Sequence, residues 1–252
     1  MDRCKHCNEV IDKDMDVVCP FCGAEVSDSP TGSIIPQSVV KPAKRPKIPV
    51  TVMLGITVDG TGSSNSFQVG IPLTLKIILE KLEAKAKSVR CYLQIHRDLD
   101  YGEEPVLITN NGSPAQALED LKSVVFTGGG DAEESHLDAV ENLLTLPWEP
   151  DLSTCRGAIL GILNADTKPL RSGKSIQELA QEIKKRNLLF YLVCEPTPQL
   201  QEIVNETGGM MFPISNNPEA SELQKIAMQL GASIIASVSK HSTVPIVGPQ
   251  PD

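Results

Sequence analysis

The feature that most constrains the fold of this chain is a regular alternation of strand-like and helix-like segments from residue 50 onward. Residues 50–58 are almost continuously apolar, as expected for a central parallel strand covered on both faces. Residues 75–82 carry apolar side chains at i, i+3, i+4 and i+7, the period of an amphipathic helix. The same patterns predict further strands at 89–96, 104–109, 158–163, 188–194 and 210–214, and further helices around 137–144, 176–183, 200–204 and from 223. This alternation predicts an α/β fold, a doubly wound and mostly parallel six-stranded sheet.

The N-terminal segment, residues 1–29, holds four of the seven cysteines in the spacing C-x2-C-x11-C-x2-C. Two such turns can complete a tetrahedral thiolate shell around Zn²⁺, which leaves no position for a substrate. A piece of this size cannot bury a sufficient core, so the metal would have to stabilise it. A disulfide pair or free thiols are the alternative. The pattern resembles a zinc ribbon with a structural Zn²⁺, and the predicted ligands are Cys4, Cys7, Cys19 and Cys22.

Charge and proline content divide the chain into four segments. Residues 1–29 carry seven acids against three bases, which disfavours contact with a phosphate backbone. Residues 30–49 hold five prolines and four basic side chains but no acid, and we interpret them as a Pro-rich basic linker. Residues 50–240 form the predicted α/β domain. Residues 241–252 are again Pro-rich and are predicted to be a flexible tail.

The lack of a signal segment, the apolar runs and the remaining cysteines bear on the cellular compartment. There is no apolar signal segment behind Met1, and the longest apolar runs are too short to span a bilayer. The remaining cysteines, Cys91, Cys155 and Cys194, lie in apolar segments, as buried free thiols of a reducing compartment would. A net charge of −9 argues against a broad nucleic-acid-binding surface. We expect a cytoplasmic protein without membrane contact.

Oxygen-bearing side chains follow three of the predicted strands. The first strand runs into Asp59-Gly60-Thr61-Gly62-Ser63, which combines a carboxylate with two hydroxyls. A glycine-rich segment, 127–134, brings further acids to the start of a helix, and a third strand ends in 164–166, Asn-Ala-Asp. Because ligands of such sheets bind beyond the carboxyl ends of the strands, these oxygens predict a site for Mg²⁺ or Mn²⁺. A simple helix cap is the alternative for the first segment.

The motifs DxTGS at 59–63, GGGDxxE at 128–134 and NAD at 164–166 together resemble those of a von Willebrand factor A (vWA) domain. The resemblance covers residue 50 to about residue 240. It implies a Rossmann-like α/β fold with one divalent cation at a metal-ion-dependent adhesion site (MIDAS). It also implies that a partner protein supplies an Asp or Glu carboxylate to the metal.

The resemblance assigns a metal-binding role only to those residues of this sequence that stand at matching positions of the family's motifs. Where the family usually has the third-loop Asp this chain has Asn164, with Asp166 two residues further on, so either could act as a ligand. The partner-binding surface would surround Asp59, Gly130 and Asp131. The other predicted magnesium ligands are Asp59, Thr61 and Ser63 from the first loop, with Asp131 and Glu134 from the second.

The expected function is non-catalytic: a protein–protein interaction or adaptor module in a cytosolic complex. Cytosolic vWA proteins of this type resemble adaptors that serve AAA+ ATPases, kinase–phosphatase sets, or stress and defence systems. No general base or nucleophile elbow stands out, and Ser172–Ser175 lacks the upstream glycine of a phosphate-binding loop. A metal-dependent hydrolase is one alternative, and a nucleic-acid-binding zinc-ribbon protein is the other.

Overall fold

The computed structural model describes residues 47–67, 70–149, 151–215 and 218–248, together with two short strands near the N-terminus. The chain divides into two compact units, Met1–Arg45 and Pro46–Asp252. In the first unit, β1 (Asp2–Arg3) pairs antiparallel with β2 (Val10–Ile11). The four cysteines predicted to bind zinc lie outside the described residues, so that prediction stays untested.

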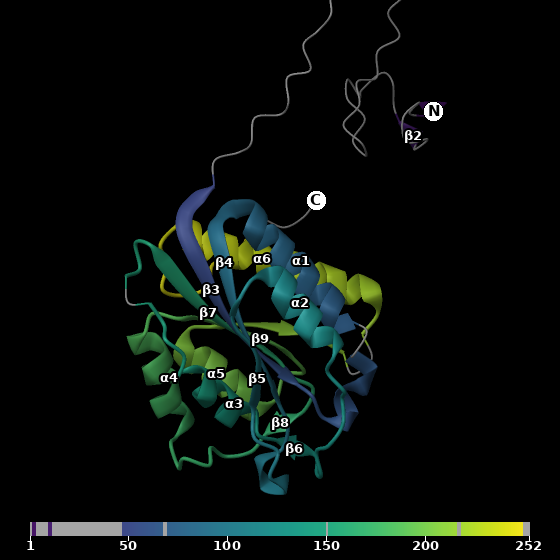
Figure 1. The fold of residues 1–252 in the computed structure, drawn as a ribbon, viewed down its shortest axis with the longest axis vertical. Helices are drawn as coiled ribbons and strands as arrows, with labels where there is room; N and C mark the ends of the chain where they lie inside the picture. The colour runs from purple at the N-terminus through teal and green to yellow at the C-terminus, as the bar shows by residue number, and fades with distance from the viewer. Residues whose placement is uncertain are drawn as a thin grey trace, which may run out of the picture. The chain divides into compact units, whose positions relative to one another are not determined.

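Six strands build the sheet of the second unit: β3 (Ile48–Asp59), β4 (Ala86–His96), β5 (Val106–Gly112), β7 (Cys155–Ile162), β9 (Leu189–Cys194) and β10 (Met210–Pro213). Their order is β10-β9-β7-β3-β4-β5, and all neighbours are parallel except β4 and β5 (Figure 1). These two form a hairpin through the 3-10 turn η2 (Leu99–Tyr101). The five parallel strands therefore end at one edge, called the carboxyl edge below.

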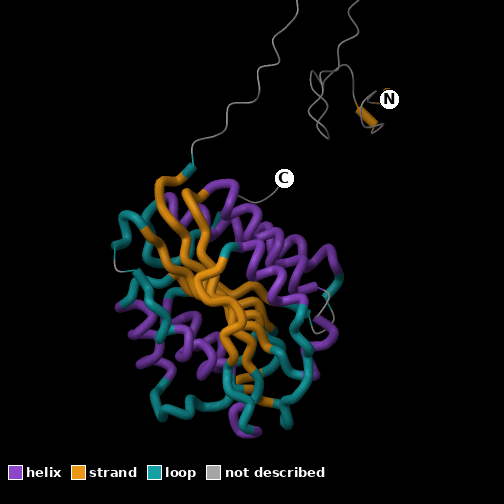
Figure 2. The backbone as a smooth tube through the Cα atoms, in the orientation of Figure 1, coloured by secondary structure: helices purple, strands orange, loops and turns teal. Residues whose placement is uncertain are grey.

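Helices cover both faces of this sheet, as Figure 2 shows. One layer contains α1 (Gly70–Lys85), α2 (Pro114–Lys122) and α6 (Ala220–Ser239). The other contains α3 (His136–Leu143), α4 (Ile176–Lys185) and α5 (Pro198–Thr207). This arrangement confirms the predicted fold class. None of the described helices is both long and apolar enough to cross a membrane.

The central strand β3 holds the two layers together. From Val52 to Asp59 every residue is buried, and alternate side chains join the hydrophobic cluster beneath α1 and α6. On the other face Gly55 makes room for Trp148, because a Cβ there would lie 2.9 Å from the indole ring. The indole ring thus packs on the middle of the sheet.

The described elements differ from the sequence prediction in several places. Helix α2 was not predicted, although Ser113 caps it and Pro114 opens it. Strand β3 begins at Ile48, inside the segment assigned to the linker. The segment assigned to a flexible tail packs on α6 as far as residue 248: the Ser233 hydroxyl donates to the Ile246 carbonyl at 2.6 Å.

Candidate metal centre

The first loop begins at Asp59, the last residue of β3, whose side chain is almost completely buried. Asp59 Oδ1 accepts hydrogen bonds from the Thr61 N–H at 2.9 Å and from the Thr61 hydroxyl at 2.8 Å. Ser63 Oγ lies 2.9 Å from Thr61 Oγ1. In the described part of the chain, Asp59 Oδ2 has no hydrogen-bond donor. The loop therefore gathers a carboxylate and two hydroxyls and leaves one buried carboxylate oxygen unsatisfied.

The second loop packs directly against the first. The Gly62 N–H donates to the Gly128 carbonyl at 3.1 Å, and Gly128 and Gly129 both have positive φ angles, 83° and 76°. A Cβ on Gly129 would lie 2.9 Å from Glu134 Oε1 and 3.1 Å from Thr61 Cγ2. Gly129 thus leaves room for both the Glu134 carboxyl and the Thr61 side chain beside the second loop.

Glu134 lies in the short strand β6 (Glu133–Glu134), which pairs with β8 (Asp166–Thr167). Its side chain is buried, and within the described residues its Oε2 has no partner. Burial, and then the nearby carboxylates of Asp59, Asp98 and Asp131, raise the pKa of Glu134 to about 8. The Glu134 carboxyl is therefore largely protonated at neutral pH unless a cation offsets the surrounding negative charge.

The third loop contributes Asn164. Its Nδ2 donates to Ser63 Oγ at 3.1 Å, while its Oδ1 is buried without a donor in the described part of the chain. Asp166 faces other groups, because its Oδ1 accepts from the Thr167 N–H at 2.8 Å and from the Thr197 hydroxyl at 2.6 Å. Of the two candidates left open by the sequence, the structure places Asn164 beside the first loop.

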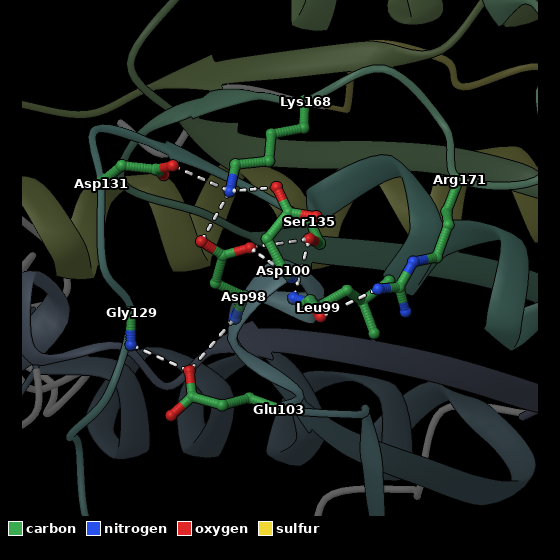
Figure 3. A network of polar contacts seen from close by, with 9 residues as sticks. All are labelled: Asp98, Leu99, Asp100, Glu103, Gly129, Asp131, Ser135, Lys168 and Arg171. Carbon is green, nitrogen blue, oxygen red and sulfur yellow. Dashed lines mark hydrogen bonds and ion pairs between the residues drawn. The ribbon is translucent and has the colours of Figure 1, made fainter.

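Asp131, another predicted ligand, lies in a different cluster (Figure 3). Its carboxylate is 3.1 Å from Lys168 Nζ, which also contacts Asp98 at 2.6 Å and Asp100 at 2.9 Å. Burial on its own would raise the pKa of Asp98, but the Lys168 ammonium outweighs it and lowers the pKa. We call Asp98, Asp100, Asp131 and Lys168 the Lys168 cluster. Here the chain's own ammonium takes the place of an external cation.

Two further side chains, neither singled out from the sequence, hold the loops in place. Arg97 Nε donates to the carbonyls of Gly60 at 3.1 Å and Thr127 at 2.7 Å, which ties the first loop to the second. Glu103 Oε2 accepts the Gly129 N–H at 2.9 Å (Figure 3). Arg97 directly follows the predicted strand 89–96, whereas no local pattern marks Glu103.

The three unsatisfied oxygens, Asp59 Oδ2, Glu134 Oε2 and Asn164 Oδ1, come from three loops and are the donor type that Mg²⁺ and Mn²⁺ prefer. The described residues contain no group of three or more His, Cys, Asp or Glu side chains that could hold a metal. A cation here would accordingly depend on hydroxyl and amide oxygens and on water as well. The residues present fit a hard divalent cation of this kind.

The other cysteines of the second unit agree with the sequence analysis. Cys91, Cys155 and Cys194 are free and buried. Burial raises the pKa values of the Cys91 and Cys194 thiols to about 12, so neither is a reactive thiolate at neutral pH.

Comparison with solved structures finds a similar fold in a protein described as von Willebrand factor type A from Catenulispora acidiphila. The TM-score is 0.52 and the sequence identity is 13%. The match covers 74% of this chain and 43% of that one, so this chain spans less than half the length of the matched structure. No family model and no curated protein sequence matches the chain. The likeness shows the fold: the second unit has a vWA-like α/β architecture.

Proposed function

We propose that this protein is a non-catalytic interaction module that binds a partner protein through a divalent cation at the carboxyl edge. The observation that carries the proposal is the set of three buried oxygens without donors, on Asp59, Glu134 and Asn164. Leaving buried polar atoms unpaired costs about 1–3 kcal/mol each, so their grouping in three neighbouring loops calls for a ligand. The vWA-like fold, which often mediates protein–protein contacts, supports the same conclusion.

In this proposal Asp59, Thr61 and Ser63 hold Mg²⁺ or Mn²⁺ from one side, and Asn164 and Glu134 supply further oxygens. The bound cation offers an open coordination position to an Asp or Glu carboxylate of the partner. Asp131 is half exposed and paired with Lys168, so it can join the cation only by leaving that pair. Otherwise it remains part of the partner-facing surface around Gly130.

The N-terminal unit has a second role in the proposal. A zinc-stabilised module held by Cys4, Cys7, Cys19 and Cys22 would give a second contact or a scaffold, joined through the basic linker. Two contacts on one tether bind more tightly than either alone, because the second binding event becomes intramolecular. We propose a cytoplasmic setting in a multiprotein complex, such as one built around an AAA+ ATPase or a kinase.

The decisive experiment compares the wild type with Asp59→Asn. This variant keeps an oxygen that can accept from Thr61 but removes the charge that a cation needs. We expect Mg²⁺ binding by calorimetry, and Mg²⁺-dependent capture of a partner from native lysate, to be lost in Asp59→Asn. Glu80→Gln, an exposed change on α1, should retain both.

The same capture from Asp59→Asn as from wild type would refute the proposal. Substitution is a cleaner test than chelation, because EDTA would also remove Zn²⁺ from the N-terminal unit.

A further inference from the structure

A cavity of about 320 Å³ opens beside the Lys168 cluster. Its wall is built by the η2 turn, by β6 and the start of α3, and by the segment that leads from β8 toward α4. Figure 3 labels five residues of this wall: Leu99, Asp100, Ser135, Lys168 and Arg171. Because charged side chains make up most of the wall, a ligand of this cavity must match its charge.

The two bases of the wall are already paired. Lys168 Nζ lies within 3.1 Å of three carboxylates, those of its own cluster. Arg171 donates from Nη2 to the Leu99 carbonyl at 3.1 Å, and its Nη1 lies 3.6 Å from Glu104 Oε1. Because both positive charges are balanced within the chain, the cavity has none to offer to an anion.

The acids of the wall are not balanced in the same way. Asp138 is half-buried and accepts the Arg171 backbone N–H at 2.8 Å, and Glu133 is exposed. Among the described residues, neither of these two acids forms an ion pair with a lysine or an arginine. The wall and its ion-pair partners hold six carboxyl groups against two bases, a formal charge of −4: Asp98, Asp100, Glu104, Asp131, Glu133 and Asp138. The ligand that this cavity attracts is therefore a cation.

The cavity borders the surface proposed to face the partner. Glu133 directly precedes Glu134 on β6, and neighbouring side chains of a strand point to opposite sides. Glu133 therefore lines the cavity, while Glu134 is buried. Tyr101 is 56% exposed, and its ring lies 5.7 Å from Lys168 Nζ and fills the space where Gly130 would carry a Cβ. A partner that contacts the surface around Gly130 can thus contact the Tyr101 ring and the cavity as well.

We propose that this cavity binds an arginine side chain of the partner protein, close to the Asp or Glu that the partner presents to the cation. The inference rests on the proposed function, because it assigns a second feature to the same partner. A guanidinium donates charge-assisted hydrogen bonds to carboxylates and stacks on aromatic rings, so it suits Glu133, Asp138 and the ring of Tyr101. The motif recognised on the partner is an acid with an arginine close by, rather than an acid alone.

Two small probes test the cavity directly: N-acetyl-argininamide and N-acetyl-citrullinamide. They have nearly the same shape, but citrulline carries an uncharged urea group in place of the guanidinium. In NMR titrations of the zinc-loaded full chain in Mg²⁺, we expect the arginine probe to shift the backbone amide signals of Ser135, Asp138 and Arg171. The citrulline probe should bind about tenfold more weakly, because its hydrogen bonds to the carboxylates lack the positive charge. Equal affinity for the two probes, or no shift at these amides, would overturn the inference.

Variants of the wall test where the arginine probe binds. Glu133→Gln combined with Asp138→Asn removes two charges and leaves an oxygen that can still accept the Arg171 N–H. We expect this double variant to bind the arginine probe about tenfold more weakly than the wild type does. Glu80→Gln combined with Glu119→Gln is the matched control, because it removes the same charge from exposed positions on α1 and α2. Equal weakening in the two double variants would contradict binding in the cavity.

A selection from a random peptide library in Mg²⁺ tests the motif on the partner. We expect the wild type to enrich peptides that contain an Asp or Glu together with an arginine. The double variant of Glu133 and Asp138 should still enrich the acid, but should select arginine only at its background frequency. Arginine at background frequency among the peptides selected by the wild type would contradict the inference.

The two proposals fail in different ways. If Asp59→Asn has no effect on Mg²⁺ binding, the proposed function is wrong, whatever the arginine probe does. If Mg²⁺ binding depends on Asp59 but the arginine and citrulline probes bind equally, only the assignment of the cavity is wrong.

Discussion

Two groups of carboxyl side chains lie at the carboxyl edge, and they differ in what balances their charge. In the Lys168 cluster, Asp98 is completely buried, and the Lys168 ammonium contacts it along with Asp100 and Asp131. Around Asp59 no ammonium or guanidinium contacts the carboxylate among the described residues, and Oδ2 has no donor at all. The first group carries its cation within the chain. In the proposed function, a cation from outside completes the second.

If the proposed function holds, this difference separates a structural role from a binding role for similar residues. Acids after parallel strands converge on one edge whatever their purpose, so convergence alone does not identify a metal site. What distinguishes the Asp59 group is its unsatisfied oxygens and the raised pKa of Glu134.

The largest effect is expected from Lys168→Met. This change leaves the Asp98 carboxylate buried without a counter-charge, and the free energy of unfolding should fall by about 3–5 kcal/mol in urea denaturation. Lys174→Met is the matched control, because Lys174 pairs with Glu141 and Glu182 at a more exposed position and should cost about 1 kcal/mol or less. Equal losses in the two variants would mean that the Lys168 cluster is not a buried ion-pair network.

The next effect concerns Mg²⁺ and Asp59. A ligand present at 100 times its dissociation constant stabilises the folded state by about 2.7 kcal/mol, and we expect a gain of this order in wild type. Asp59→Asn should show no such gain in thermal unfolding with and without Mg²⁺. Asp166→Asn should keep it, since the Asp166 contacts are to Thr167 and Thr197. If Asp166→Asn lost the stabilisation by Mg²⁺ and Asp59→Asn kept it, Asp166 rather than Asp59 would be the residue that holds the cation.

A smaller gain is expected from Asn164→Asp. A second carboxylate beside Ser63 should raise Mg²⁺ affinity by roughly tenfold, about 1.4 kcal/mol, in calorimetric titration. Without Mg²⁺ the same change should destabilise the protein, because it buries another negative charge. A decrease in Mg²⁺ affinity would show that Asn164 does not face the cation.

The smallest effect is a pH dependence caused by Glu134. The pKa of Glu134 is about 8 in the folded protein and near its ordinary value of 4.5 in the unfolded chain. Between these values the folded state holds a proton that the unfolded state has lost, so Mg²⁺-free stability should fall as pH rises and level off above pH 8. We expect a difference of roughly 1 kcal/mol from pH 7 to pH 8, as measured by denaturation, and Glu134→Gln should remove it. If Glu134→Gln showed the same dependence of stability on pH, the proton would be bound by another group.

Much of the fold could be predicted because the signals are local. The continuous apolar run of β3 and the helical period of α1 are visible within short windows. Helix α2 was missed because it is short and buries few side chains, although Ser113-Pro114 marks its start. The position of residues 241–248 depends on contacts between distant parts of the chain, such as the hydrogen bond from Arg156 on β7 to the Ser242 carbonyl.

The candidate site likewise has residues that the local sequence predicts and residues that only the fold brings together. Asp59, Thr61 and Ser63 are neighbours in sequence, so their grouping could be predicted. Lys168 meets Asp98 across 70 residues, and the two histidines meet across 40, and neither pair has a sequence spacing that marks it. The three strand-end loops pointed to the right edge of the sheet, but only the side-chain contacts separate Asp131 from the Asp59 group.

The central claim, that an external cation belongs beside Asp59 and not in the Lys168 cluster, is tested most directly by anomalous diffraction from crystals grown in Mn²⁺. We predict a manganese peak bonded to Asp59 and close to Ser63 and Asn164, with Lys168 still in contact with Asp98. A crystal of intact protein with no peak at Asp59, or with manganese in place of the Lys168 ammonium, would contradict the account.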